Sequence, residues 1–143
     1  MSTITITTVD GMTESDCLAI GRRLTRPSSE FQIEVLQRMS GKMSSATPLA
    51  LWHERGCLLG WACSHKWQKM QTLEMFTDEN HRGRGIAPAL SAALIAASVL
   101  NRSNVLAVFA PVTEAIARRA GFTDVRRFES SWREATGLHT PCG

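Results

Sequence analysis

The stretch NHRGRGIAPAL, residues 80–90, places two glycines and two arginines between an alternating segment and an alanine-rich one. Glycine adopts positive φ easily and lets the backbone approach a ligand closely. The first N–H groups of a helix have no internal partners and attract anions, and arginine adds forked hydrogen-bond donors. The stretch is therefore either a surface turn or a cradle for phosphates, and its surroundings must decide.

The segments around this stretch predict a strand–helix–strand unit. TLEMFTD (72–78) and NVLAVFA (104–110) are typical of strands, and IAPALSAALIAASVL (86–100) is typical of a helix. That helix has almost no polar face, so it should be covered on most sides, and Pro88 is tolerated in its first turn. Such a unit needs a crossover, so we expect its two strands to be parallel neighbours.

The chain before this unit also has clear periodicity. Alternation and apolar spacing predict, in order, a strand, two helices and two antiparallel strands, over residues 3–9, 13–24, 30–39, 49–56 and 57–67. Thr13 and Asp16 resemble a capping box at the first helix, and the turn between the last two strands falls at 54–56.

The chain after this unit is predicted to close with a helix and a strand. Thr113 opens a short helix that ends at Gly121, and a last strand covers 122–132. Residues 135–143 are expected to form a loosely ordered tail. The order β-α-α-β-β-β-α-β-α-β predicts one domain over residues 1–143, of the α/β (α+β) class, with a mixed, mostly antiparallel sheet flanked by helices.

Composition restricts the partners. The 143 residues suit one domain, and the net charge of +3 with a pI near 8.9 suits an anionic small ligand better than nucleic acid. No apolar run reaches the roughly 18 residues of a membrane span, and we recognise no signal peptide at the start. The four cysteines, Cys17, Cys57, Cys63 and Cys142, form no CxxC pair, so we expect no metal site, and reduced thiols in the cytoplasm.

Arg82, Gly85 and Ala87 match the spacing Arg/Gln-x-x-Gly-x-Gly/Ala. With the strand before it, the helix after it and the later Gly121-Phe122 pair, the chain resembles the GNAT N-acetyltransferase family along nearly its whole length. MFTDENHRGRGIAPAL is similar to that family's fourth strand, loop and third helix, and VFAPVTEAIARRAGF to its fifth strand and fourth helix. The resemblance implies the GNAT fold and acetyl-coenzyme A as cosubstrate.

The resemblance also implies a coenzyme site. Backbone N–H groups of Gly83, Arg84, Gly85, Ile86 and Ala87 would bind the pyrophosphate, with Arg82 and Arg84 framing it. Pro88 has no N–H to contribute. The backbone of Met75, Phe76 and Thr77 would pair with the pantetheine arm where the two strands of the family splay apart. Plain core packing is the other reading for Met75 and Phe76, and both can hold.

For catalysis, Glu74 is the first candidate as the base that deprotonates the amine. The alternative is a glutamate on the solvent face of an alternating strand. Glu54, His53 and His65 are weaker candidates on the neighbouring hairpin. Many family members have a tyrosine acid where this chain has Ala117, and the chain contains no tyrosine. Residues 110–113 occupy the region where an asparagine is common in the family. Thr113 or a water could take its place, so the sequence does not identify the group that protonates the thiolate.

Four further side chains have a possible role on the acceptor side. Cys63 suggests a covalent route only weakly, because a strand cysteine is usually buried and inert. Trp52, Trp61 and Trp67 either line an acceptor pocket or, for at least two of them, pack in the core. An exposed edge strand near the C-terminus would support a homodimer.

Two functions follow. The first is an acetyl-coenzyme A-dependent N-acetyltransferase acting in a ternary complex on a primary amine, which is a protein lysine, a protein N-terminus or a small molecule. The second is a non-catalytic GNAT-like module that binds another protein and retains coenzyme A binding.

Overall fold

The computed structural model describes residues 1–24, 29–42 and 45–129. The elements in chain order are β1 (Ser2–Thr8), α1 (Glu14–Gly21), α2 (Glu30–Met39), β2 (Pro48–Glu54), β3 (Cys57–Cys63), β4 (Lys66–Trp67), β5 (Met70–Thr72), β6 (Glu74–Thr77), the 3-10 turn η1 (Glu79–His81), α3 (Ile86–Ala96), β7 (Leu106–Val108), α4 (Pro111–Arg119) and β8 (Val125–Arg127).

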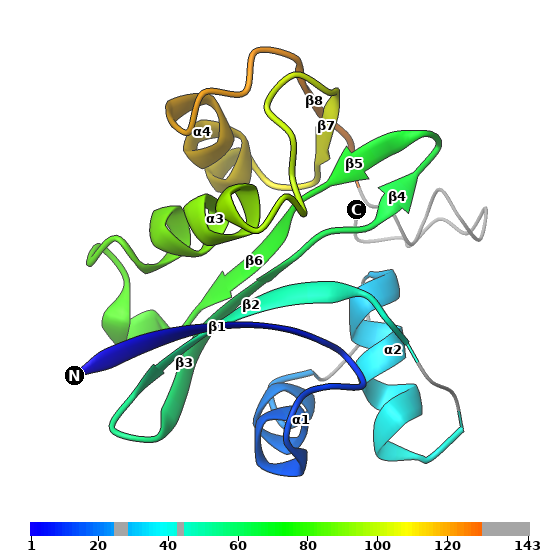
Figure 1. Cartoon of the computed structure of the whole chain (residues 1–143), viewed down its shortest axis with the longest axis vertical. Helices are drawn as coiled ribbons and strands as arrows, with labels where there is room; N and C mark the ends of the chain where they lie inside the picture. Colours follow the sequence, from blue (N-terminus) through cyan, green and yellow to red (C-terminus); the bar gives the residue numbers. More distant parts are fainter. Residues whose placement is uncertain (25–28, 43–44, 130–143) are drawn as a thin grey trace.

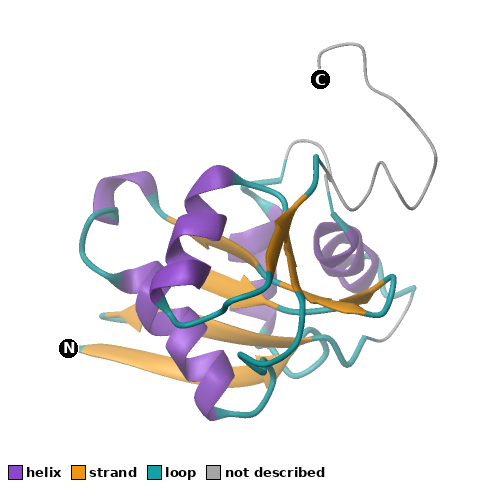
Figure 2. Ribbon diagram, turned by 90° about the horizontal axis from the view of Figure 1, so that it is seen from above, coloured by secondary structure: helices purple, strands orange, loops and turns teal. Residues whose placement is uncertain are grey.

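The strands form two four-stranded sheets, ordered β1-β2-β3-β6 and β4-β5-β7-β8, which meet where β5 leads into β6. The first sheet is antiparallel, whereas β7 runs parallel to both β5 and β8. Helices α1 and α2 lie on one face of the first sheet and α3 on the other, and α4 lies beside β7 and β8 (Figures 1 and 2). The expected mixed sheet flanked by helices is therefore confirmed. The parallel pairing expected for segment 72–78 and the strand after α3 holds only at its start: β7 pairs with β5, whereas β6 pairs with β3.

Two apolar clusters hold the layers together. On one face, Phe31 and Val35 of α2 pack with Leu51 and Trp61 of the sheet. On the other face, the buried stripe of α3 packs over Ala50 and Ala62. Small residues let α3 lie close: a Cβ on Gly60 of β3 would come within 3.0 Å of both Ile86 Cγ2 and the carbonyl oxygen of Phe76.

The helix ends follow capping rules, with three differences from expectation. Thr13 caps α1 as expected, accepting a hydrogen bond from the Asp16 N–H at 3.1 Å, but the helix ends at Gly21. Helix α4 begins at Pro111, before Thr113, because the fixed φ and missing N–H of proline suit the first helical position. Helix α3 ends at Ala96, short of residue 100.

The early end of α3 has a clear local cause. Ser98 adopts a left-handed φ of 61°. The N–H of Val99 donates to the Leu94 carbonyl, and the N–H of Ser98 donates to the Ile95 carbonyl. This is a Schellman motif, which usually has glycine at the left-handed position. Because this position is occupied by serine, the sequence did not predict that the helix ends here.

Two expected strands are divided. Segment 57–67 forms β3 and β4, and segment 72–78 contains the end of β5 and all of β6. Between β4 and β5 lies a two-residue turn in which Gln68 and Lys69 have φ of 49° and 67°. Such turns favour asparagine and glycine, so the Gln-Lys pair did not predict this hairpin.

At the C-terminal end, the last strand is shorter than expected, covering Val125–Arg127. Residues 130–132 of the predicted strand and the predicted tail 135–143 lie outside the described residues. Among the helices that the structure describes, none combines the length and the apolar character needed to cross a membrane.

Candidate functional site

The two strands that flank α3 separate at Leu73. The Leu73 N–H donates to the Ala107 carbonyl at 3.2 Å. Beyond this point β6 pairs with β3, while β7 pairs with β8 and the Phe128 N–H donates to the Val108 carbonyl. No described strand pairs with β6 on its other side, so a gap opens between β6 and β7 with Leu73 at its apex.

The backbone of β6 presents alternate residues to this gap. The Asp78 N–H donates to the Leu59 carbonyl, so the even-numbered residues of β6 bond toward β3. The amide and carbonyl groups of Met75 and Thr77 therefore face the gap. The Thr77 carbonyl accepts a hydrogen bond from Arg82 Nε at 3.1 Å. The Met75 groups remain positioned to pair with an extended ligand, as a strand would.

The loop that follows β6 depends on its glycines. Gly83 and Gly85 have φ of 80° and 81°, a region that residues with a Cβ rarely adopt. A Cβ on either glycine would meet nothing within 4 Å. The positive φ explains why the loop carries glycine, and the open space around both residues leaves its backbone accessible.

The first turn of α3 has unused donors. Gly85 is the N-cap and no side chain caps the helix in the described structure. The first helical bond runs from the Ala89 N–H to the Gly85 carbonyl, so the N–H groups of Ile86 and Ala87 have no intrahelical partner. A single small anion fits such a terminus.

The two arginines of the loop are held differently. Arg82 anchors the loop to the end of β6 through Thr77. Arg84 forms an ion pair with Glu54 of β2 at 2.8 Å, on the protein surface. Hydrogen bonds from Arg84 and from the Trp52 indole lower the pKa of Glu54 to about 2. Glu54 is thus occupied as the partner of Arg84, away from the gap.

Glu74 lies beside the apex and points toward α2. Its Oε2 accepts hydrogen bonds from Ser29 Oγ at 2.9 Å and Gln32 Nε2 at 3.3 Å. The residue is half-buried, so it does not project freely into solvent. Burial raises the pKa of the Glu74 carboxyl, although the hydrogen bonds from Ser29 and Gln32 oppose that rise. A carboxylate with a raised pKa is a stronger base than an exposed one.

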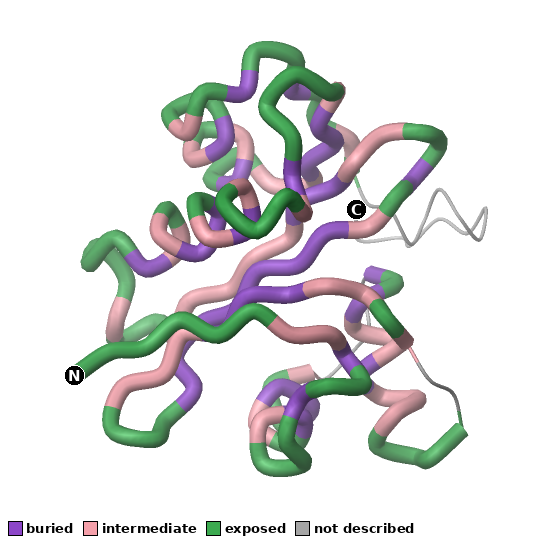
Figure 3. Tube along the Cα trace, in the orientation of Figure 1, coloured by how far each residue is buried: buried purple, intermediate pink, exposed green. Residues whose placement is uncertain are grey.

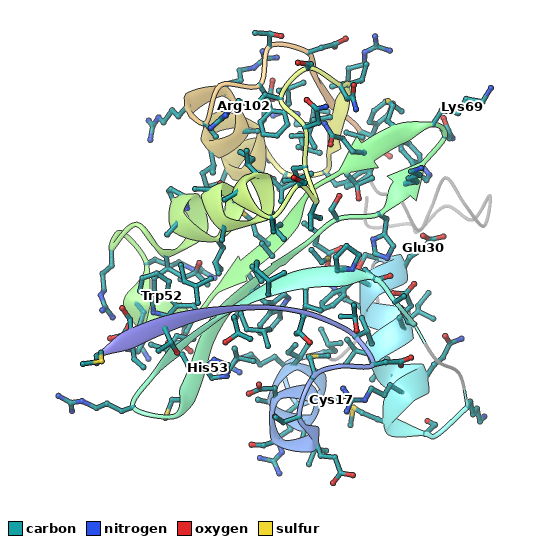
Figure 4. The ribbon with its side chains drawn as sticks, in the orientation of Figure 1. Cys17, Glu30, Trp52, His53, Lys69 and Arg102 are labelled. Carbon is teal, nitrogen blue, oxygen red and sulfur yellow. The ribbon has the colours of Figure 1, made fainter. Side chains whose placement is uncertain are left out.

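The hairpin histidines have structural partners. His65 lies 3.4 Å from Glu34 Oε1 and His53 lies 2.9 Å from Asp16 Oδ1. Trp52 and His53 are neighbours on β2 that point to opposite faces, Trp52 toward α3 and His53 toward α1 (Figure 4). Burial lowers the pKa of His65, but the hydrogen bond and charge of Glu34 outweigh it, so the net pKa is raised.

The remaining candidates are packing residues. Cys63 is fully buried, and burial raises the pKa of its thiol well above the ordinary value. Trp61 stacks on Phe76 at 4.4 Å between ring centroids, and Trp67 packs edge-on against Phe109 and Phe128. Core packing for at least two tryptophans is therefore confirmed. Ala117 and Thr113 are both buried on α4, and alanine has no proton to donate.

A polar cleft of about 1130 Å³ opens on the α2 side of the molecule. It lies between α2, residues 45–48, the β4–β5 hairpin and residues 98–105, and Glu34, His65, Lys69 and Gln71 contribute to its walls. Lys69 stands at the tip of the hairpin (Figure 4). Within the described ranges, no group of three or more His, Cys, Asp or Glu side chains is arranged to hold a metal ion.

The sequence matches no protein-family model and no curated protein. Solved structures do match. A ribosomal-protein-alanine N-acetyltransferase from Brucella melitensis biovar Abortus 2308 is 16% identical with a TM-score of 0.53, over 83% of this chain and 86% of that one. An aminoglycoside N-acetyltransferase in complex with coenzyme A is 16% identical with a TM-score of 0.56, over 90% and 93%.

A third match is a GNAT superfamily phosphinothricin acetyltransferase from Sinorhizobium meliloti in complex with acetyl-coenzyme A. It is 16% identical with a TM-score of 0.53, over 83% of this chain and 74% of that one. These structures are acetyltransferases of the fold that the sequence resembles. The chain therefore has the GNAT fold.

The sequence did not indicate the residues that hold Glu74. Ser29 and Gln32 lie more than forty positions before it. The local signal at Ser29, a serine at the N-cap of α2, concerns the start of the helix and does not point to Glu74. The pairing of Arg84 with Glu54 across the sheet had no local signal either.

Proposed function

We propose that this protein is an acetyl-coenzyme A-dependent N-acetyltransferase that acts on a primary amine. The observation that carries the proposal is the gap at Leu73, where the free edge of β6 leads directly into a glycine loop and an uncapped helix terminus. A turn that served only to reverse the chain would need neither the open edge nor the unused donors.

The residues fit the coenzyme in two places. The Met75 amide and carbonyl, facing the gap, match the amide groups of a pantetheine arm, which would add to β6 as a short strand. The N–H groups from Gly83 to Ala87 and the guanidinium of Arg82 match a pyrophosphate. Arg84 would join them by exchanging some of its contact with Glu54 for the phosphates. When bound, acetyl-coenzyme A supplies an activated acetyl thioester near the apex of the gap.

Glu74 is the proposed base. The transfer forms a bond between the amine nitrogen and the acetyl carbon and breaks the bond from that carbon to sulfur. Glu74 takes the proton of the amine, directly or through a water, and its raised pKa suits that role. The sulfur leaves as a thiolate, which takes a proton from solvent because Ala117 offers none.

The acceptor is a primary amine of a protein lysine, a protein N-terminus or a small molecule. Glu74 faces the α2 side of the sheet, on which the polar cleft also opens, so this is the side from which we propose that the amine approaches. The matched acetyltransferases act on acceptors as different as a ribosomal protein and an aminoglycoside, so their fold does not choose among these amines.

Calorimetric titration with acetyl-coenzyme A and with coenzyme A tests the cosubstrate. We expect saturable binding of both, and loss of binding in Gly85→Glu, which brings a negative charge to the anion site. Gly41→Glu is the matched control, because Gly41 is also left-handed with open space around it but lies in the loop after α2. Equal affinity of the two variants, or no binding by the folded wild type, contradicts the proposal.

A second candidate is a non-catalytic module that binds coenzyme A and recognises another protein. The buried Ala117 and the absence of tyrosine from the chain favour it. It predicts coenzyme A binding without turnover on any amine. Chromatographic measurement of coenzyme A release with a panel of lysine peptides, N-terminal peptides and small amines separates the two, and it avoids thiol reagents that would react with exposed Cys57.

A further inference from the structure

Strand β1 is an unprotected edge of the first sheet. It contains only serine, threonine and isoleucine over its seven residues, and the sheet order ends at it. Residues 2–6 are exposed, in contrast to β2 and β3 beside them (Figure 3). Proteins normally protect such edges with lysine, proline, bulges or a covering segment, and β1 has none of those residues.

The outward backbone groups of β1 are spaced as a further strand of the sheet would need them. The Val9 N–H donates to the Thr47 carbonyl, so Thr3, Thr5 and Thr7 bond inward to β2 in the antiparallel register. Ser2, Ile4 and Ile6 therefore direct their N–H and C=O groups away from the sheet. This row of alternating donors and acceptors is complementary to an antiparallel copy of itself.

The side chains beside this edge are apolar. Ile4 and Ile6 lie opposite Trp52 and Ala50, on the face that α3 covers, and they are 40% and 41% exposed. Helix α3 contacts β1 and has no charged residue. Its outer positions Pro88, Ala92 and Ala96 are exposed, although we expected this helix to be covered on most sides. Since these positions alternate with the buried Ile86, Leu90 and Leu94, they lie on the side of α3 turned away from the sheet. We therefore call only the outer edge of residues 2–6, with Ile4 and Ile6 on the face that α3 covers, the β1–α3 surface.

We propose that the β1–α3 surface is the interface of a homodimer, in which the β1 strands of two copies pair antiparallel about a two-fold axis at Thr5. Ile4 of each copy then lies opposite Ile6 of the other, and the two first sheets become one continuous sheet. The four isoleucines then lie side by side on the α3 face of the joined sheet. A two-fold contact uses the β1 edge of both copies and leaves no free edge at β1. A head-to-tail contact would leave one β1 edge unpaired.

The opposite edge of the fold is a poorer candidate. Strand β8 is three residues long and has Arg126 and Arg127 exposed on it, so two copies would bring like charges together. The homodimer that the sequence suggested through a C-terminal edge strand is thus reassigned to the N-terminal strand. The inference is independent of the proposed acetyl transfer, because the gap at Leu73 lies at the other edge of the first sheet.

Sedimentation and light scattering across a micromolar concentration series test the dimer. We expect the wild type to be a dimer and Ile6→Lys to raise the dissociation constant by at least about tenfold. Leu18→Lys is the matched control, since Leu18 is 42% exposed on α1, away from β1, and it should remain dimeric. A wild-type protein that stays monomeric, or an unchanged constant in Ile6→Lys, overturns the proposal.

Cross-linking tests the register, in a background with Cys57→Ser and Cys142→Ser. In the proposed pairing the two Thr5 residues form a non-hydrogen-bonded pair, with Cα atoms about 4.5 Å apart, within the reach of a disulfide. Thr5→Cys should therefore oxidise to a covalent dimer. Thr3→Cys should not, because Thr3 faces Thr7 of the other copy. Cross-linking of Thr3→Cys, or none of Thr5→Cys in a dimeric sample, contradicts this register.

Discussion

At the scale of single residues, the candidate catalytic groups differ in whether they already form an ion pair with another side chain. Glu54 and Arg84 are engaged with each other on the surface, and His53 and His65 are engaged with Asp16 and Glu34. Glu74 is the carboxylate beside the apex of the gap, and its partners Ser29 and Gln32 are neutral. Neutral donors orient a carboxylate without holding it permanently in an ion pair, so it remains available to take a proton.

The substitution Glu74→Gln tests the base. Gln keeps the shape and the hydrogen bonds but cannot take the proton, so we expect turnover to fall by about 100-fold or more. Affinity for acetyl-coenzyme A should stay unchanged in a calorimetric titration. In the wild type, the rate should fall as the pH drops through the raised pKa of Glu74, and this acid limb should be missing in the variant. Full activity of the variant would exclude Glu74 as the base.

At the scale of elements, the proposed anion site depends on α3, because the first turn of this helix would supply its N–H donors. Its two ends are fixed by different means. The N-terminal end rests on Gly60 of β3, where a side chain would touch Ile86 and the Phe76 backbone. The C-terminal end is closed by the Schellman motif around Ser98.

Substituting the glycine under the helix should move the donors. In Gly60→Ala, the new Cβ would lie 3.0 Å from Ile86 Cγ2 and from the Phe76 oxygen. Crowding of this kind costs about 1–3 kcal/mol of stability, and the shift of Ile86 should weaken acetyl-coenzyme A binding. Thermal unfolding and calorimetric titration measure the two effects. Unchanged values of both would show that this close approach does not position the helix.

The other end of α3 should affect stability alone. Ser98 has a φ of 61°, which glycine adopts without strain, so we expect Ser98→Gly to stabilise the protein by about 0.5–1 kcal/mol in urea unfolding. The affinity for acetyl-coenzyme A should not change, since the donors lie at the opposite end. A destabilised Ser98→Gly would mean that the serine makes a contribution beyond its backbone conformation.

At the scale of the whole molecule, one polar contact connects a helix to the place where the two sheets meet. His65 lies between β3 and β4, and its contact with Glu34 joins α2 to the junction of the two sheets. The pKa of His65 is raised in the folded protein above its ordinary value of 6.5, mainly through the hydrogen bond and charge of Glu34. The folded chain therefore binds a proton more tightly than the unfolded chain does.

This linkage gives a pH dependence with a definite sign. The stabilisation from protonated His65 is fully present below about pH 6.5 and is lost as the pH rises through the folded-state pKa. We expect the free energy of unfolding to fall over that range in urea titrations, and the fall to be smaller in His65→Gln. Equal slopes in wild type and His65→Gln would refute this assignment.

Much of the fold could be predicted from local patterns. The alternation of residues 3–9, the apolar spacing of α2 and the glycine loop each depend on a few neighbouring residues. The order of the main elements and the glycine loop before α3 could therefore be predicted from them. The predicted positive φ at the loop glycines is confirmed at Gly83 and Gly85. The hairpin turn at Gln68-Lys69 and the helix end at Ser98 were missed, because these residues adopt left-handed conformations without a glycine or asparagine to announce them.

The sequence by itself determined the class of fold and the loop suited to phosphates, because helix periodicity, strand alternation and glycine conformation are local properties. Only the tertiary structure decided where β6 and β7 separate, which helix supplies the partners of Glu74, and that β1 is left as an open edge. The physical reason is that these features arise from contacts between residues far apart in the chain, such as Leu73 with Ala107 and Glu74 with Ser29. Such contacts depend on how the layers pack, which no single stretch of sequence encodes.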